Sequence, residues 1–262
     1  MKTTISKTGK YQFTAEAVHC DIQQKLFIST LCHHILRAAD LHSTERKFGM
    51  SYLKTINKTW VLSRFALEIF QMPKAYDEFS IETWVENVMK YFTARNFSIL
   101  NPLEQTLAYC RSIWSMIDTE TRHPIDLFSV RNGEIANYIT SEKKCPIAGF
   151  ANWKPNNHTK PTKQIQILYS DCDSNGHLNS VKYIDHVLDL WDIDFHKTFH
   201  VYRLEIAYQA ECYFGDTLLI YREEIPTKDA NTKEFRIQIC KLLASEKTEM
   251  EVSKIKICFT KQ

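Results

Sequence analysis

The residues of this chain best suited to chemistry lie in one short stretch, residues 173–177. A carboxylate, an amide and an imidazole occupy every second position there, as Asp173, Asn175 and His177. In an extended segment, residues spaced by two point the same way, so these side chains would share one face. A carboxylate can activate a water molecule, and an amide or a backbone N–H can hold an oxyanion. The stretch therefore predicts a hydrolytic site.

The same residue types are also common in ordinary turns. Asn179 or Ser180 is expected to cap a helix that follows, and the N–H groups and dipole of a helix N-terminus favour negative charge. Gly176 permits close approach of the backbone, so the N–H groups of residues 176–179 are expected to hold an oxyanion. Spacing alone does not decide between a turn and a site.

A second pair of candidates, Glu211 and Cys212, lies in a strand-like segment. Neighbouring strand residues face opposite sides, so only one of the two is expected to face a site. A nucleophilic pair of Cys212 with His177 is one interpretation, and a buried structural thiol is the other. A single Glu in such a segment is usually a surface residue.

Periodicity predicts the elements that must position these residues. Each half of the chain is expected to contain one amphipathic helix followed by strands with two-residue alternation. The first half has a helix over residues 29–41 and strands over 60–70, 79–88, 91–100 and 107–118. The second half has a helix over 180–191 and strands over 202–212, 216–225, 234–244 and 251–261. A helix on a long antiparallel sheet is an α+β architecture.

A turn-rich stretch rich in Pro, Asn and Lys, residues 145–163, separates the halves. We therefore expect a first domain over residues 1–140, a basic linker over 141–163 and a second domain over 164–262. The repeated order of elements indicates an internal duplication. An offset of 150 residues aligns Asp21 with Asp171, and an offset of 137 aligns residues 67–69 with 204–206.

Composition limits the class of protein. The 262 residues carry 33 Lys and Arg against 31 Asp and Glu, a net charge of +2, which argues against a nucleic-acid binder. The chain has no apolar run long enough for a transmembrane helix, and its start lacks the apolar region of a signal peptide. The eight cysteines form no C-x-x-C pair, so we expect free thiols, no metal, no cofactor and a cytoplasmic location.

The segment from Asp171 to Tyr183 resembles the helix-entry motif of the hot-dog thioesterases. More narrowly, it is similar to the motif D-x-D-x-N-x-H-x-N-x-x-K-Y of the fatty acyl-ACP thioesterases of plants and bacteria. The segments 60–64, 82–85, 95–97 and 112–118 resemble strands in the first half of that family. The resemblance covers nearly the whole chain, from about Phe13 onward.

This resemblance implies a tandem hot-dog fold, in which each half is a long helix wrapped by an antiparallel sheet. It implies a hydrolase of lipid metabolism that cleaves the fatty acyl-ACP thioester and releases the fatty acid, ending chain elongation in fatty acid biosynthesis. The family has a catalytic Glu, followed by Cys, 34 residues beyond its His. The implied catalytic residues are Asp173, Asn175, His177 and Glu211.

The resemblance also assigns acyl-chain binding to the first half. At the offset of 150, the places of the acid, the amide and the imidazole are taken there by Gln23, Lys25 and Phe27. The first half is therefore expected to lack catalytic residues. The implied partner is an acyl carrier protein, with no nucleic acid and no stable membrane insertion, and a homodimer stays open.

Two other functions remain open. A hot-dog acyl-CoA thioesterase motif also fits residues 171–183, and a non-catalytic acyl-binding protein is a further alternative. The mechanism is open as well, because the water could be activated by Asp173 and Glu211 with His177, or Asp173 could attack as a nucleophile.

Overall fold

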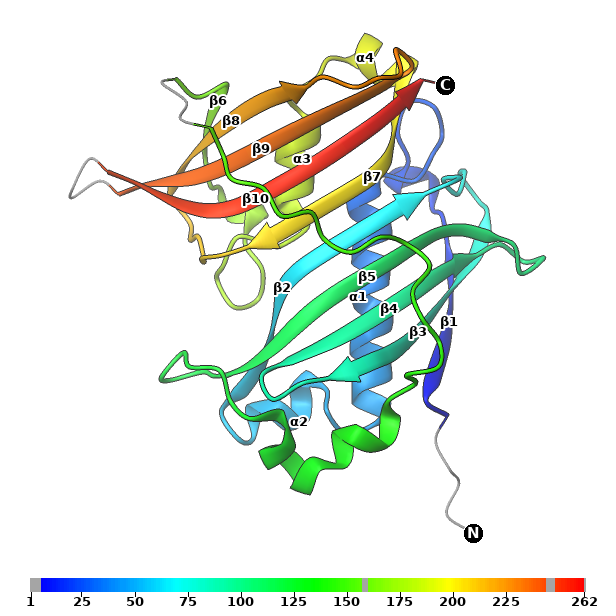
Figure 1. Cartoon of the computed structure of the whole chain (residues 1–262), viewed down its shortest axis with the longest axis vertical. Helices are drawn as coiled ribbons and strands as arrows, with labels where there is room; N and C mark the ends of the chain where they lie inside the picture. Colours follow the sequence, from blue (N-terminus) through cyan, green and yellow to red (C-terminus); the bar gives the residue numbers. More distant parts are fainter. Residues whose placement is uncertain (1–5, 157–159, 244–247, 262) are drawn as a thin grey trace. The chain divides into compact units, whose positions relative to one another are not determined.

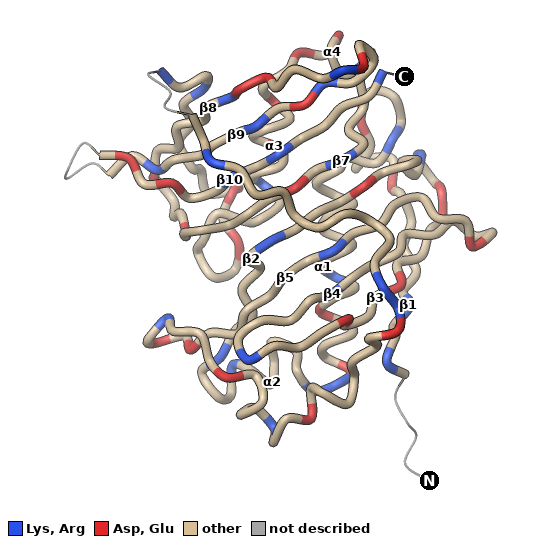
Figure 2. The backbone as a smooth tube through the Cα atoms, in the orientation of Figure 1, with Lys and Arg blue, Asp and Glu red and all other residues tan. Residues whose placement is uncertain are grey.

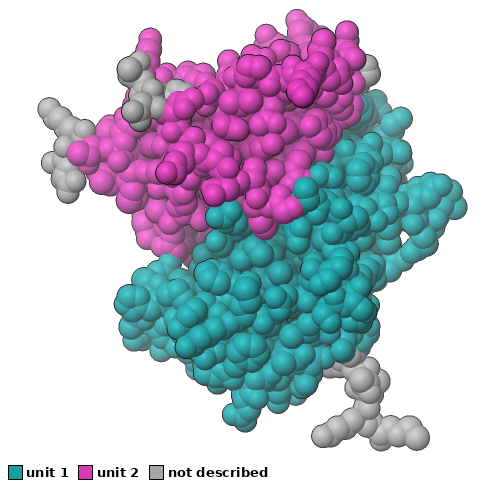
Figure 3. Space-filling model, in the orientation of Figure 1, with its two compact units in different colours: residues 1–148 teal, residues 149–262 magenta. Residues whose placement is uncertain are grey.

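The structure is a computed structural model that describes residues 6–156, 160–243 and 248–261. Its chain divides into two compact units, residues 1–148 and 149–262 (Figure 3). The division lies inside the turn-rich stretch. Among the described residues, no helix combines the length and the apolar character needed to cross a membrane.

The first unit is an antiparallel sheet with a long helix (Figure 1). Its strands follow the order β1-β3-β4-β5-β2. Its helix α1 contacts β1 and β3. The elements are β1 Thr8–Thr14, η1 Ala17–His19, α1 Ile28–Glu45, α2 Met50–Lys54, β2 Lys58–Ile69, β3 Glu78–Val88, β4 Phe92–Leu100, β5 Thr106–Asp118 and η2 Leu127–Tyr138.

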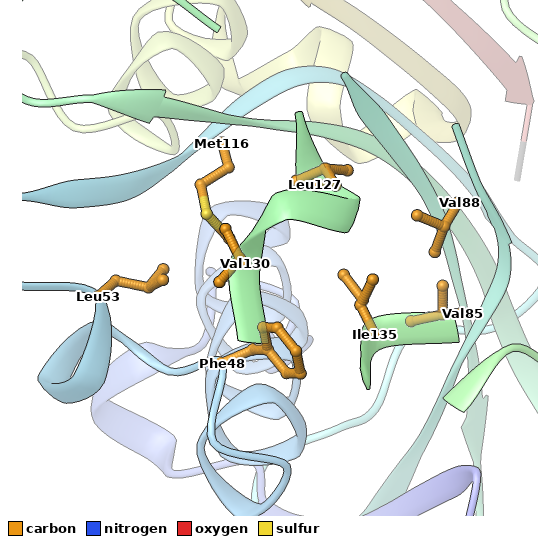
Figure 4. Close-up of a cluster of buried hydrophobic side chains, with 8 residues drawn as sticks. All are labelled: Phe48, Leu53, Val85, Val88, Met116, Leu127, Val130 and Ile135. Carbon is orange, nitrogen blue, oxygen red and sulfur yellow. The ribbon is translucent and has the colours of Figure 1, made fainter. Parts of the chain in front are cut away.

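Hydrophobic patterning explains the packing of this unit. On α1, the side chains of Leu31, Ile35, Ala38 and Ala39 are buried, as their spacing predicts. A second buried cluster forms where α2 and η2 meet the ends of β3 and β5 (Figure 4). Its members are Phe48, Leu53, Val85, Val88, Met116, Leu127, Val130 and Ile135.

The second unit repeats this plan, with strand order β7-β10-β9-β8-β6. The predicted helix over residues 180–191 is shorter than expected and is followed by a second helix. Asp192 accepts a hydrogen bond from Phe195 N at 2.8 Å and so starts α4. Residue 244, expected to end a strand, lies outside the described residues. The elements are β6 Lys163–Gln166, η3 Tyr169–Asp171, α3 Lys182–Leu188, α4 Ile193–Thr198, β7 Phe199–Tyr208, β8 Thr217–Ile225, β9 Thr232–Leu243 and β10 Thr248–Lys261.

In each unit, side-chain contacts fix the part of the inter-domain stretch that belongs to that unit. In the first unit, Trp84 Nε1 donates to the carbonyl of Lys143 at 2.6 Å, and Lys143 Nζ lies 2.5 Å from Glu82. In the second unit, Ala151 N donates to Glu205 at 2.6 Å, and the Trp153 ring lies beneath two cationic side chains. The basic residues of this stretch therefore include a lysine already paired with a carboxylate of the sheet.

Candidate active site

Residues 173–177 form a tight turn, not the extended segment that the sequence suggested. Asp173 N donates to the carbonyl of His177 at 2.8 Å, and Gly176 N donates to the carbonyl of Asp173 at 3.0 Å. Gly176 has a φ of +80°, which favours glycine. The Asp173 side chain completes the turn, because its Oδ1 accepts from Asn175 N at 2.8 Å and from His177 N at 3.1 Å.

The expected oxyanion hole from the backbone of residues 176–179 is wrong. Gly176 N and His177 N both donate to Asp173. Leu178 N donates to the carbonyl of Cys212 at 2.8 Å, and Asn179 N donates to that of Asp171 at 2.8 Å. All four N–H groups already have a hydrogen-bond partner, so they do not form an oxyanion hole in this structure. The Asn175 side chain makes no hydrogen bond to the described residues and is exposed at the turn.

The expected helix cap is also different. Val181 occupies the N-cap position of α3 and provides no side-chain cap. Asn179 Oδ1 instead accepts a hydrogen bond from Val181 N at 3.2 Å, and Val181 directly precedes the first helical residue. The helix α3 therefore begins without a side-chain cap.

The first unit contains the same turn. The two turns align at an offset of 152 residues, not at the offset of 150 that the sequence suggested. Asp21 N donates to the carbonyl of Lys25 at 2.8 Å, and Gln24 N donates to that of Asp21 at 2.9 Å. Asp21 Oδ1 accepts from Gln23 N at 2.8 Å and from Lys25 N at 3.0 Å. Asp21 is thus the counterpart of Asp173.

The sequence suggested that the first unit has neither the acid nor the amide, and this expectation is wrong. In the observed register, Asp21 corresponds to Asp173 and Gln23 corresponds to Asn175. The first unit lacks the imidazole, because Lys25 stands where the second unit has His177. Leu26 N donates to the carbonyl of Pro73 at 2.8 Å, as Leu178 N does to that of Cys212. Met72 therefore stands at the place of Glu211. A shift of two preserves strand alternation, which is why alternation could not detect the error.

The second unit brings His177 and Glu211 together. His177 Nε2 lies 3.6 Å from Glu211 Oε2, and the two side chains are 24% and 33% exposed. Glu211 lies in the loop after β7, which ends at Tyr208, and not within the strand. The carboxylate also accepts a hydrogen bond from Tyr213 Oη at 3.1 Å. A base and an imidazole thus meet at a solvent-accessible point.

Cys212 faces the other way, as strand-like alternation predicts. Its side chain is buried, and it shares a hydrogen bond with the Tyr183 hydroxyl on α3. Burial raises the pKa of the Cys212 thiol. Because the thiolate is the nucleophilic form, this cysteine is poorly suited to attack a thioester. The interpretation as a buried structural thiol fits, and the Cys212–His177 nucleophile does not.

The side chains of Asp173 and Asn175 share the turn with His177, but no hydrogen bond joins them to Glu211. Sequence reasoning missed Tyr213, whose ring lies edge-on to the His177 imidazole at 5.1 Å between centroids. It also missed Lys241 on β9, which donates to the carbonyl of Glu211 at 3.2 Å. No motif points to either residue.

Two histidines of the second unit have a spacing that metal sites use. His196 and His200 have H-x-x-x-H spacing, but α4 ends at Thr198, between them, so they do not share a helix face. In the part of the chain that the structure describes, no group of three His, Cys, Asp or Glu side chains could hold a metal ion.

Comparison with known families gives a consistent picture over both units. Residues 7–130 match the model of the acyl-ACP thioesterase N-terminal domain, and residues 155–261 match that of the C-terminal domain. The chain is 24% identical, over 80% of its length, to an oleoyl-acyl carrier protein thioesterase of Coriandrum sativum, and covers 60% of that relative. It is 24% identical, over 76% of its length, to a palmitoyl-acyl carrier protein thioesterase of Gossypium hirsutum, of which it covers 51%. The chain therefore spans about half to three-fifths of these curated relatives.

Solved structures are similar over nearly the full chain. An acyl-ACP thioesterase from Bacteroides thetaiotaomicron has a TM-score of 0.85 at 39% identity, with 97% of this chain and 98% of that one covered. The 12:0-ACP thioesterase from Umbellularia californica has a TM-score of 0.83 at 15% identity, with 98% and 95% covered, and shows the fold alone. The predicted tandem hot-dog fold is confirmed.

Proposed function

We propose that this chain, which belongs to the acyl-ACP thioesterase family, hydrolyses the thioester of fatty acyl-ACP and releases the free fatty acid. The pairing of His177 with Glu211 at 3.6 Å is the observation that carries the proposal. The proposal is also supported by the match of both units to the two domain models of the family. Release of the fatty acid would end chain elongation.

In the proposed mechanism, Glu211 and His177 position and deprotonate one water molecule. The water oxygen attacks the thioester carbon, and the carbonyl oxygen takes the negative charge. The amide of Asn175 is the proposed donor to that oxygen, since the loop N–H groups are occupied. The C–S bond then breaks, and the proton taken by His177 passes to the leaving thiolate.

Asp173 is the fourth proposed catalytic residue. Its Oδ1 is held by two N–H groups, while its Oδ2 has no hydrogen-bond partner among the described residues. We propose that Oδ2 accepts a hydrogen bond from the attacking water. An Oδ1 that accepts two backbone hydrogen bonds makes a weaker nucleophile, so the activated-water route is preferred over a covalent one.

We further propose that the first unit binds the acyl chain. Its turn has Lys25 and Met72 in the places of His177 and Glu211, which supports a division of labour within the chain. The partner in this proposal is an acyl carrier protein. A cytoplasmic location is supported by the eight cysteines, all of which are free thiols.

The proposal is tested with purified chain, a panel of acyl-ACP substrates of different chain length, and acyl-CoA substrates of matched length. We expect cleavage of acyl-ACP with a higher kcat/KM than of acyl-CoA, and a loss of about 100-fold or more in His177→Ala and in Glu211→Gln. A preference for acyl-CoA would contradict the carrier assignment. Tight fatty-acid binding without cleavage would replace hydrolysis by acyl binding.

A further inference from the structure

The Glu211 carboxylate has a second partner besides His177. The Tyr213 hydroxyl donates to Glu211 Oε2 at 3.1 Å, and this same oxygen lies 3.6 Å from His177 Nε2. The Tyr213 ring lies edge-on to the imidazole, at 5.1 Å between centroids and 75° between planes. One tyrosine thus touches both members of the proposed acid–base pair.

We propose that Tyr213 is a positioning residue, which fixes the Glu211 carboxylate against His177. This inference rests on the proposed thioester hydrolysis at Glu211 and His177. A hydrogen bond donated to the carboxylate restricts its orientation, and a general base must be held within reach of the proton that it accepts.

Contacts with Asp216 and Lys241 hold Tyr213 in place. Tyr213 N donates to Asp216 Oδ2 at 2.9 Å, and Lys241 Nζ lies 3.1 Å from the same carboxylate. Lys241 also donates to the carbonyl of Glu211 at 3.2 Å, and its ammonium lies 5.5 Å from the centre of the Tyr213 ring. The Lys241 side chain is only 12% exposed, so these contacts are sheltered from solvent.

The first unit shows that this loop closes without a tyrosine. Lys74 takes the place of Tyr213, and its N–H donates to Asp77 Oδ2 at 2.9 Å, as Tyr213 N does to Asp216. Lys74 is also bridged to Lys25 as Tyr213 is bridged to His177. The backbone turn therefore needs only the aspartate. The phenol occurs in the unit that also has the imidazole and the carboxylate.

Four charged or titratable groups in contact with the Glu211 residue or its neighbours define the surroundings of the carboxylate. They are His177 in the turn, Tyr213 and Asp216 in the loop of Glu211, and Lys241 on β9. Cys212 points to the opposite side, toward Tyr183. Among the first four, Tyr213 is the donor to the Glu211 carboxylate itself, so its hydroxyl can be removed without a change in net charge.

The test compares Tyr213→Phe with wild type in the acyl-ACP assay. Phenylalanine keeps the ring beside His177 and removes only the hydroxyl. We expect kcat to fall about tenfold with KM within about twofold of wild type. A fall in kcat without a matching change in KM is a result that a purely structural role would not give.

The matched control is Tyr169→Phe, because Tyr169 lies in the same unit and is 88% exposed. It should match wild type in kcat and KM. If wild type cleaves acyl-ACP and Tyr213→Phe has an unchanged kcat, the positioning role is overturned and the proposed function stands. If wild type cleaves no acyl-ACP, the proposed function fails and the positioning role fails with it.

Discussion

At the residue scale, Asp173 and its counterpart Asp21 share one structural task, and a chemical task is proposed for Asp173 alone. Both aspartates accept two backbone N–H groups and close the same turn. In the second unit the turn also presents His177 and Asn175. The internal duplication therefore supplies a natural control that separates the structural task of the carboxylate from a chemical one.

Asp173→Asn is expected to keep the turn and lose the chemistry. The amide oxygen of Asn still accepts the two N–H groups, so the free energy of unfolding should change little. Because the amide NH2 that replaces Oδ2 cannot accept a hydrogen bond from the attacking water, kcat should fall about 100-fold or more. Asp21→Asn should leave kcat unchanged. Wild-type activity in Asp173→Asn would show that the carboxylate only builds the turn.

Cys212 provides a second test at this scale. Its buried thiol bonds to Tyr183 and points away from His177, so Cys212→Ser should keep kcat within about threefold of wild type. The hydroxyl of Ser retains a partner for Tyr183, which limits the loss of stability. Steady-state kinetics with acyl-ACP measure the effect. A loss of 1,000-fold would restore the cysteine as nucleophile.

At the scale of elements, alternation predicted the strands well. The expected strand over residues 79–88 is β3 Glu78–Val88, and the expected strand over 107–118 is β5 Thr106–Asp118. The sequence missed β1 Thr8–Thr14 and β6 Lys163–Gln166, which lie at sheet edges and contain few apolar residues. Edge strands depend on pairing with a neighbour, and that partner is not visible in the local sequence.

The sequence proposes the residues of the candidate site, but it does not predict their geometry. Residue types and family resemblance identified His177 and Glu211, and the structure brings them together. The expected oxyanion hole was wrong because the partners of its N–H groups, the carbonyls of Asp171 and Cys212, are fixed by tertiary contacts. Spacing carries no information about such partners, nor about the approach of Lys241 from β9.

His42 on α1 is expected to make the fold sensitive to acid. Burial lowers the pKa of His42 to about 2, and the nearby guanidinium groups of Arg95 and Arg46 act in the same direction. The unfolded chain therefore binds this proton first, near its usual pKa of about 6.5. Stability should fall as pH drops below about 6.5, by about 1.4 kcal/mol per pH unit from this group alone.

Denaturant unfolding of wild type and His42→Gln between pH 7 and pH 4.5 measures this contribution. Gln retains a donor for the carbonyl of Lys7, to which the His42 ring is hydrogen-bonded at 3.1 Å. Carboxylates elsewhere contribute equally to both proteins and cancel in the comparison. The variant should lose less stability over this range than wild type does. Parallel curves would mean that His42 is protonated without cost in the folded state.

At the scale of the whole molecule, net charge says little about the partner. The chain carries +2 overall, and Lys, Arg, Asp and Glu are interspersed along both units (Figure 2). Several lysines already have carboxylate partners, such as Lys143 with Glu82 and Lys144 with Glu86. In the proposed function, recognition of an acidic acyl carrier protein would therefore depend on a local set of cations.

Electrostatic docking makes the rate depend on salt. Between about 0.01 M and 0.15 M ionic strength the Debye length shrinks from about 30 Å to about 8 Å, so attraction between exposed charges is screened. We expect kcat/KM for acyl-ACP to fall severalfold over this range, mainly through KM. An uncharged acyl-pantetheine thioester of the same chain length should show no such fall, because it reaches the same site without the carrier. Equal salt dependence of the two substrates would locate the effect in the chemistry, and insensitivity of both would exclude charge-driven docking.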